Sequence, residues 1–211
     1  GTRPIYANSA YATYRWARRI AESWRTDTDI GFPHAVEWVN VLRNLDHDAA
    51  HPGAAGPGHW NDPDYLGPEL GMTSSQAGAQ LSMWAMVAAP LILGSDPRAL
   101  SPVTIAMLTN REVIAVDQDP LGIQGTIADQ LGSGQVWRRL LAGGSVAVAL
   151  LNRGSAPLRI STSARRVGLA ESRAYTVRDL WAHRSTKSGG EISAVVAPDS
   201  VVLYRVAAVA G

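Results

Sequence analysis

The sequence predicts an α/β segment followed by an all-β domain. From residue 4 to about residue 106, short apolar runs alternate with stretches whose apolar residues recur at helical spacing. This alternation is typical of parallel βα units. From about residue 136 the apolar runs are short, are separated by turn residues and show no helical spacing, which indicates antiparallel strands. We therefore expect βα units in residues 1–125 and an antiparallel β-sandwich in residues 126–211.

The first segment is expected to hold parallel strands with helices between them. Strands are expected over residues 5–8, leading into Trp24, over 58–61 and over 91–94. Helices are expected over residues 14–21, 36–45 and 74–88, and from Pro102 onward behind a Ser101 cap. Thr73 and Gln76 have the spacing of a capping box for the helix that starts at Ser74. The run from Val113 to Pro120 resembles a further buried strand that ends in polar residues.

The second segment is expected to consist of strands alone. They are expected over residues 136–141, 146–151, 158–161, 175–180, 192–196 and 201–206. Gly143-Gly144 lies between the first two runs and predicts a hairpin. We expect the sandwich to begin between Gly122 and Gln135.

Composition excludes several classes of partner. The chain has 19 basic and 18 acidic residues, so we expect no nucleic-acid partner and no anionic membrane surface. No apolar run reaches the length of a membrane helix. The chain has no cysteine, and the spacing of His34, His47 and His51 is not supported by other ligand residues. We therefore expect no metal and no cofactor.

Two polar clusters carry the candidate chemistry. Trp60, Asp62 and Asp64 lie in a nine-residue stretch, 56–64, that also holds two prolines and two glycines. Carboxylates on a stiff backbone accept hydrogen bonds from sugar hydroxyls, and an indole packs on the sugar ring, although Asn-Asp-Pro-Asp is also ordinary turn chemistry. Arg25 and Asp29 follow the strand into Trp24, where they would face one cavity or form an ordinary surface ion pair.

These clusters belong to a longer series of motifs. In chain order they are Trp24-Arg25-x-x-x-Asp29-Ile30, Gly56-Pro57-Gly58-x-Trp60-Asn61-Asp62-Pro63-Asp64, Trp84-Ala85-x-x-x-Ala89-Pro90-Leu91 and Asn110-x-Glu112-Val113-Ile114-Ala115-Val116-x-Gln118-Asp119-Pro120-Leu121-Gly122-x-Gln124-Gly125. The series resembles the α-galactosidases of glycoside hydrolase family 27. The resemblance runs along the whole chain and is strongest from Trp24 to Gly125.

The resemblance implies a (β/α)₈ barrel followed by a β-sandwich. A barrel takes about 250 residues, whereas only about 120 precede the expected sandwich here. We therefore expect residues 1–125 to be barrel strands 5–8, taken from a longer protein or a truncated gene product. The missing N-terminal half of the barrel is then the expected partner. We expect the isolated chain either to self-associate through its open strand edges or to be an excerpt from a longer folded chain.

The resemblance also assigns roles. It makes Asp29 the general acid/base of a retaining glycosidase that cleaves terminal α-D-galactosides, with Arg25, Trp60 and Asp64 binding the sugar. We interpret Asp62 as a turn-capping or arginine-pairing residue. The family's nucleophile is an aspartate in a Lys-x-Asp motif, and this chain has no such motif. We therefore expect the 211-residue chain alone to be inactive or nearly so.

The substrate is left open by the segment around Tyr6. Ser9 and Ala12 fall where small residues would widen the pocket at the sugar 2-position, as in family members that act on N-acetylgalactosaminides. β-L-Arabinopyranosides and dextran-type substrates are further alternatives within the family. The resemblance makes a secreted or extracellular enzyme plausible.

A different class of function is a non-catalytic carbohydrate-binding module or a purely structural domain. The expected sandwich supports this alternative, with Trp137 and Trp181 as sugar platforms. Single tryptophans in strands are more often part of the core.

Overall fold

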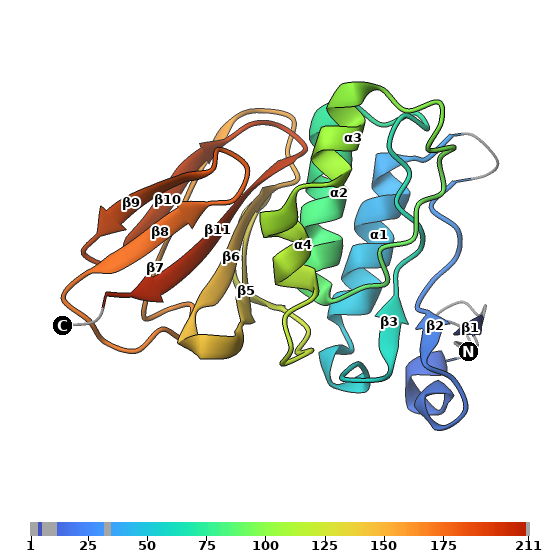
Figure 1. Ribbon diagram of the computed structural model, residues 1–211, viewed down its shortest axis with the longest axis horizontal. Helices are drawn as coiled ribbons and strands as arrows, with labels where there is room; N and C mark the ends of the chain where they lie inside the picture. Colours follow the sequence, from blue (N-terminus) through green and yellow to red (C-terminus); the bar gives the residue numbers. More distant parts are fainter. Residues whose placement is uncertain (1–3, 6–11, 32–34, 210–211) are drawn as a thin grey trace.

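The computed structural model describes residues 4–5, 12–31 and 35–209. Figure 1 shows a layer of helices between a small parallel sheet near the N-terminus and a β domain that ends at the C-terminus. The α/β segment and the all-β domain predicted from the sequence are both present.

The parallel sheet consists of β1 (Pro4–Ile5), β2 (Ser23–Arg25) and β3 (Trp60–Asp62), in the order β1-β2-β3. The strands expected near Trp24 and over 58–61 are confirmed, whereas residues 6–8 of the first expected strand lie outside the described residues. The fourth expected strand, 91–94, is reduced to one parallel bridge between Leu66 and Leu93. The backbone turns at Asp64, where φ is 100°, so pairing beyond β3 resumes only at Leu66.

The helices mostly follow the expected pattern. They are α1 (Trp38–Ala49), α2 (Ser74–Val87), α3 (Pro102–Leu108) and α4 (Arg111–Asp117), with short 3₁₀ turns η2 (Thr13–Arg15), η3 (Ala17–Arg19), η4 (Pro52–Ala54) and η5 (Ala142–Gly144). The Thr73–Gln76 capping box of α2 is confirmed, and the Ser101 side chain accepts a hydrogen bond from the Thr104 N–H at the start of α3. The α-helix expected over 14–21 is wrong, because Trp16, at φ −132°, separates two single 3₁₀ turns.

The strand expected from Val113 is also wrong, because these residues form α4. The Asn110 side chain accepts hydrogen bonds from the N–H groups of Glu112 (3.0 Å) and Val113 (3.3 Å) and so caps the helix. Val113 and Val116 are buried on one face at i and i+3. The apolar run is therefore the buried face of a short helix.

The β domain has a six-stranded antiparallel sheet, in the order β4-β5-β6-β11-β8-β9, and a two-stranded sheet, β10-β7. The strands are β4 (Thr126–Leu131), β5 (Gly134–Leu140), β6 (Val146–Asn152), β7 (Leu158–Ser163), β8 (Tyr175–Asp179), β9 (Arg184–Ser188), β10 (Glu191–Val196) and β11 (Ser200–Ala208). The expected strands are confirmed, and η5 joins β5 to β6 at Gly143-Gly144. Sequence reasoning missed β4 and β9, because both are edge strands with mostly polar or exposed side chains.

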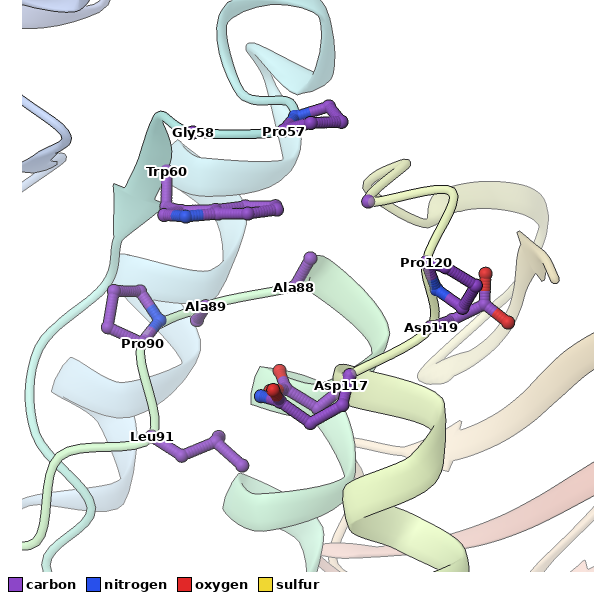
Figure 2. Close-up of a pocket in the computed structure, with 12 residues that line it drawn as sticks. Pro57, Gly58, Trp60, Ala88, Ala89, Pro90, Leu91, Asp117, Asp119 and Pro120 are labelled. Carbon is purple, nitrogen blue, oxygen red and sulfur yellow. The ribbon is translucent and has the colours of Figure 1, made fainter. Parts of the chain in front are cut away.

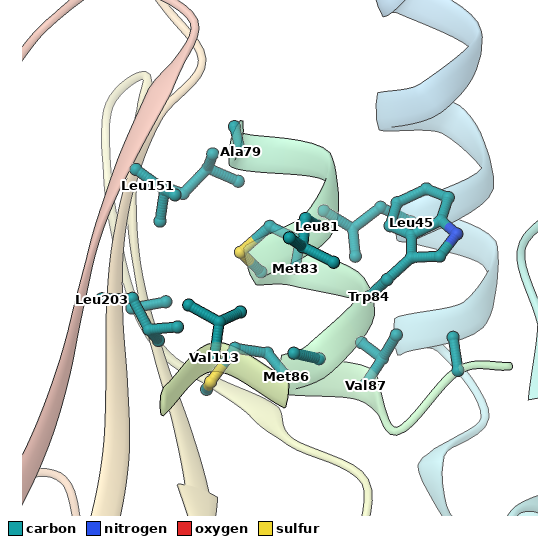
Figure 3. Packing of buried hydrophobic residues seen from close by; sticks show 14 of the residues in the cluster. Leu45, Ala79, Leu81, Met83, Trp84, Met86, Val87, Val113, Leu151 and Leu203 are labelled. Atoms are coloured by element: carbon teal, nitrogen blue, oxygen red, sulfur yellow. The ribbon is translucent and has the colours of Figure 1, made fainter. Parts of the chain in front are cut away.

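The larger sheet is covered on both faces. One face packs on the two-stranded sheet through a core that includes Val148, Leu150 and Ile160. The other face packs on α2 and α4, as Figure 3 shows for Leu151 and Leu203. Every residue of the central strand β6 is buried, which is why that strand is an unbroken apolar run ending in Asn152.

A buried cation links the two parts of the chain. Arg139 of β5 is 1 % exposed and donates to the carbonyl oxygens of Ala85, in α2, and Asp117, at the end of α4. Carbonyl groups at a helix C-terminus are partial negative charges, so a guanidinium there stabilises the helix. Asp117 lies in the same buried region, and burial raises the pKa of its carboxyl to about 6, against the smaller opposing effects of Gln118 and Arg139.

Asp117 should make stability depend on pH. Its folded pKa is raised above the ordinary value of 3.8, so ionisation weakens folding as pH rises from about 4 to about 6, and the loss persists above that range. We expect Asp117→Asn to raise the free energy of unfolding at pH 7 by about 1–3 kcal/mol. Urea unfolding at pH 7 and pH 3.5 measures this difference. An equal difference at both pH values would contradict the assignment.

Candidate active site

The site forms where two adjacent parallel strands end. β2 and β3 pair with Arg25 opposite Asp62, so the segments that follow them leave the sheet at the same edge. The first segment carries Asp29 and the second carries Asp64. Carboxyl ends of neighbouring parallel strands are where ligand sites form in α/β folds, because their loops converge there.

Arg25 joins the two carboxylates. Its Nη1 lies 3.2 Å from Asp29 Oδ1 and its Nη2 lies 2.8 Å from Asp64 Oδ2. The side chains of Arg25 and Asp64 are 8 % and 5 % exposed, whereas that of Asp29 is 64 % exposed. The structure therefore brings three predicted residues together, with two of them fixed in the interior and Asp29 facing solvent.

Asp64 is held in a strained conformation. Its φ of 100° lies in a region that side chains other than glycine rarely adopt. Its carboxylate accepts hydrogen bonds from the N–H groups of Ile30 (2.9 Å) and Tyr65 (2.8 Å). Burial raises the pKa of the Asp64 carboxyl, and the Ile30 N–H and the Arg25 guanidinium oppose this rise. Strain of this kind persists where surrounding contacts determine the backbone, and it is frequent at functional sites.

Asp62 has the structural role expected for it. Its Oδ1 accepts a hydrogen bond of 2.9 Å from the Asp64 N–H and closes the turn. Burial raises the pKa of the Asp62 carboxyl, while the Asp64 N–H and the Arg25 charge lower it. Asp62 therefore supports the conformation of Asp64.

The reverse side of β2 and β3 is a buried polar network. Trp24 Nε1 donates to Asn61 Oδ1 (2.9 Å), and Asn61 Nδ2 donates to Gln124 Oε1 (3.0 Å). Gln124 Nε2 in turn donates to the Asp48 carbonyl oxygen (3.0 Å). Burial raises the pKa of the Asp48 carboxyl well above its usual range, and the nearby Asp62 charge adds to this effect. The motif residues Trp24, Asn61 and Gln124 thus hold the strands together and do not face the site.

Tyr65 is a site residue that sequence reasoning missed. It follows Asp64 directly, and its hydroxyl donates to the Gly31 carbonyl oxygen (2.9 Å), beyond Asp29 in the neighbouring loop. Burial raises the pKa of the Tyr65 hydroxyl, and the charges of Asp64 and Asp29 raise it further. In the sequence, only its position immediately after the Asn-Asp-Pro-Asp motif indicates that Tyr65 lies near the site.

Trp60 lies away from this cluster. It lines a cavity of about 430 Å³ at the other end of β3 (Figure 2). The cavity is also bordered by Pro57, Gly58, Ala88, Ala89, Pro90, Leu91, Asp117, Gln118, Asp119, Pro120 and Gly122. Gly122 has φ +58°, and a Cβ there would lie 3.0 Å from Trp60 and Pro57, so a larger residue would be strained and tightly packed against Trp60. Sugar binding by Trp60 stays a prediction, and the structure does not join it to Arg25.

Of the two residues expected at the sugar 2-position, Ser9 and Ala12, the structure describes only Ala12. Ser9 lies outside the described residues. Ala12 is half-buried with φ 46°. The next residue, Thr13, donates its hydroxyl to the Arg25 carbonyl oxygen (3.0 Å). This bond places the Ala12 segment beside β2, and the role of both residues in specificity stays a prediction.

The remaining candidate residues have structural contacts. Trp137 is fully buried, and Trp181 packs against the core with its Nε1 donating to Ser82 Oγ (3.0 Å). His51 stacks on Tyr14 with ring centroids 3.5 Å apart. Among the described residues, no group of three metal-ligating side chains comes together, and no helix has the length and apolar character needed to cross a membrane. His34 lies outside the described residues.

Comparison with known families identifies the chain. Residues 2–119 match the family model described as alpha galactosidase A, and residues 132–206 match the alpha galactosidase C-terminal beta sandwich domain. The chain belongs to glycoside hydrolase family 27, the α-galactosidases. Its fold is accordingly part of the family's barrel followed by its sandwich.

Individual relatives agree with this membership. An α-galactosidase of rice is 42 % identical over 192 residues, which cover 90 % of this chain and 45 % of the rice protein. An α-N-acetylgalactosaminidase of chicken is 34 % identical over 203 residues, covering 90 % of this chain and 49 % of that protein. The crystal structure of α-galactosidase I from Mortierella vinacea has a TM-score of 0.82 and 26 % identity, covering 94 % of this chain and 57 % of that one. The family 27 chain spans about half the length of the curated relatives it matches.

Removing Arg25 should leave the buried Asp64 carboxylate without its positively charged partner. In Arg25→Met the buried Asp64 carboxylate loses its cation, and breaking such a buried pair lowers the free energy of unfolding by about 3 kcal/mol at pH 7. Because burial already raises the pKa of Asp64, the loss should shrink as pH falls towards 4 and the carboxyl takes up a proton.

Thermal unfolding at several pH values measures this effect. Arg98→Met is the matched control, since Arg98 pairs with Asp96 at 2.7 Å on the surface, and we expect it to lower stability far less than Arg25→Met does. Equal losses in the two variants would contradict the role given to Arg25.

Proposed function

We propose that this chain supplies the acid/base half of the active site of a retaining glycosidase that cleaves terminal α-D-galactosides. The observation that carries the proposal is the cluster in which buried Arg25 bridges buried Asp64 and exposed Asp29. Family membership supports the reaction class. Since the relatives are about twice as long, the activity is proposed for the completed barrel, meaning this chain joined to a segment that supplies the other strands.

The proposed mechanism divides the chemistry between two carboxyls, of which this chain would supply one. A retaining glycosidase places its acid/base and its nucleophile about 5–5.5 Å apart on either side of the glycosidic bond. Asp29 would give its proton to the leaving oxygen and then take a proton from the attacking water. Its exposed side chain can exchange protons with solvent, while the fixed Arg25 and Asp64 offer a donor and an acceptor to sugar hydroxyls. The nucleophile would come from the segment that completes the barrel.

The α-galactoside is the preferred substrate, because the most identical relative described above is a plant α-galactosidase. N-Acetylgalactosaminides are the second candidate, since the chicken relative carries that activity in its name and Ala12 is small. β-L-Arabinopyranosides and dextran-type substrates remain alternatives. Comparison of kcat/KM for nitrophenyl glycosides of each sugar, measured on the completed barrel, would rank them.

Asp29→Asn should separate proton transfer from the rest of catalysis. General acid/base catalysis contributes about 10²–10⁴-fold, so we expect turnover of melibiose by the completed barrel to fall by about that factor. Formation of the glycosyl-enzyme from 2,4-dinitrophenyl α-galactoside needs no proton and should change little in a pre-steady-state burst. Asp96→Asn, a surface carboxylate, is the control. Unchanged melibiose turnover in Asp29→Asn would overturn the assignment.

The 211-residue chain alone should behave differently from the completed barrel. It lacks a Lys-x-Asp nucleophile motif, so we expect no hydrolysis of nitrophenyl α-galactoside. Its open parallel strand edges should favour self-association, which light scattering detects. A monomer that hydrolyses the nitrophenyl substrate would refute the proposal that the nucleophile lies in another segment.

A further inference from the structure

We propose that one polar face of α1, together with buried Asp27, positions the acid/base Asp29. The α1 polar face consists of Asn40, Arg43, Asn44 and His47, which share one side of the helix at i, i+3, i+4 and i+7. This inference rests on the proposed function, because it takes Asp29 to be the acid/base. The residues of the face are positioning residues and act through the backbone of the loop that carries Asp29.

Arg43 makes the direct link to Asp29. Its Nη2 donates to the Asp29 carbonyl oxygen (3.2 Å), and its Nε donates to Asp27 Oδ2 (3.2 Å). Its Nη1 donates to Asn40 Oδ1 (2.8 Å), within α1. One planar guanidinium therefore fixes the peptide of Asp29 relative to the helix. A lysine ammonium lacks this fixed fork of N–H donors and could not hold the three acceptors in the same geometry.

Asn44 joins the two loops of the site. This fully buried side chain donates through Nδ2 to the carbonyl oxygens of Thr28 (2.7 Å) and Pro63 (2.9 Å). Thr28 precedes Asp29 and Pro63 precedes Asp64. A single amide thus sets the spacing between the backbone segments that carry the two carboxylates.

Asp27 completes the arrangement from the loop side. Its side chain is 5 % exposed, its Oδ1 accepts from the Thr28 N–H (2.7 Å), and its Oδ2 faces both Arg43 and His47. A buried carboxylate is unfavourable unless it is paired and hydrogen-bonded. Asp27 is one of the unspecified positions in the Trp24-Arg25-x-x-x-Asp29 motif. Its contacts assign it a role, which is to anchor the loop to α1.

The need for positioning follows from the exposure of Asp29. Its carboxylate is 64 % exposed and is ion-paired with Arg25 in the described part of the chain. A solvent-facing carboxyl has little packing to orient it, so its direction depends on the peptide that Arg43 and Asn44 hold. A misplacement of about 1 Å can lower the rate of an oriented reaction by about 100-fold.

Arg43→Met in the completed barrel tests the inference, with Asp29→Asn measured beside it. We expect kcat/KM for melibiose to fall by about 10- to 100-fold, while that for 2,4-dinitrophenyl α-galactoside changes by less than about threefold, because its leaving group needs no proton. Arg43→Lys keeps a cation beside Asp27, so it should recover much of the thermal stability and little of the melibiose activity.

The matched control is Arg153→Met. Arg153 forms a two-point ion pair with Asp46 of α1, both contacts at 2.7 Å, and neither residue belongs to the α1 polar face. We expect this variant to leave the ratio of the two substrates unchanged. A general loss of helix stability would instead lower both activities together.

The outcomes separate the two proposals. If the completed barrel shows no α-galactosidase activity, or if Asp29→Asn loses both substrates equally, the proposed function fails. If Asp29→Asn behaves as expected but Arg43→Met leaves the substrate ratio of the parent protein unchanged, the positioning role is overturned. If Arg43→Lys restores melibiose activity together with stability, the role of Arg43 is structural and the inference is also overturned.

Discussion

The burial of α2 on all sides is the constraint on which the rest of the structure depends. One side packs on α1 and the other on the six-stranded sheet, so the helix belongs to both parts of the molecule (Figure 3). Its polar groups are used as well. Trp84 Nε1 donates to the Asp64 carbonyl oxygen (2.6 Å), and Gln80 bonds the backbone of Tyr65 (3.0 Å) and Gly67 (3.1 Å). The β-sandwich therefore supports the site indirectly, by fixing the helix that holds the Asp64 loop.

The site is built from two loops, each tied to its own helix. α2 holds the segment from Asp64 to Gly67, and α1 holds the segment from Asp27 to Ile30 through Arg43 and Asn44. Arg25 then joins the two segments at their carboxylates. The buried charges of Arg25 and Asp64 are paired with each other, which lowers the cost of placing them in the interior. This arrangement gives rigid positions to Asp64 and to the backbone of Asp29 while leaving the Asp29 carboxyl accessible.

The described part of the barrel has two open sheet edges and a cavity beside Trp60, which a complete barrel would cover or use. Within the described residues, the parallel sheet ends at β1 on one side and at a single bridge near Leu93 on the other. The cavity beside Trp60 lies next to that second edge, between β3, the end of α2 and the loop after α4 (Figure 2). In the proposed enzyme, further strands would cover both edges and would bring a nucleophile towards Asp29. The described residues already fix the peptide of Asp29, the proposed acid/base, through Arg43 and Asn44.

The sequence by itself determined the order of parallel units and sandwich strands, the caps of α2 and α3, and the grouping of Arg25, Asp29 and Asp64. These features depend on local periodicity, on caps, and on motifs at strand ends, all of which are written in neighbouring residues. The tertiary structure alone decided that Val113 begins the buried face of a helix, that Trp60 faces a separate cavity and that Asp27 is buried. Each of these depends on contacts with distant residues: the sandwich for α4, Gly122 for Trp60, and Arg43 and His47 for Asp27. Periodicity and motif spacing carry no information about such contacts, because the packing of separate elements determines them.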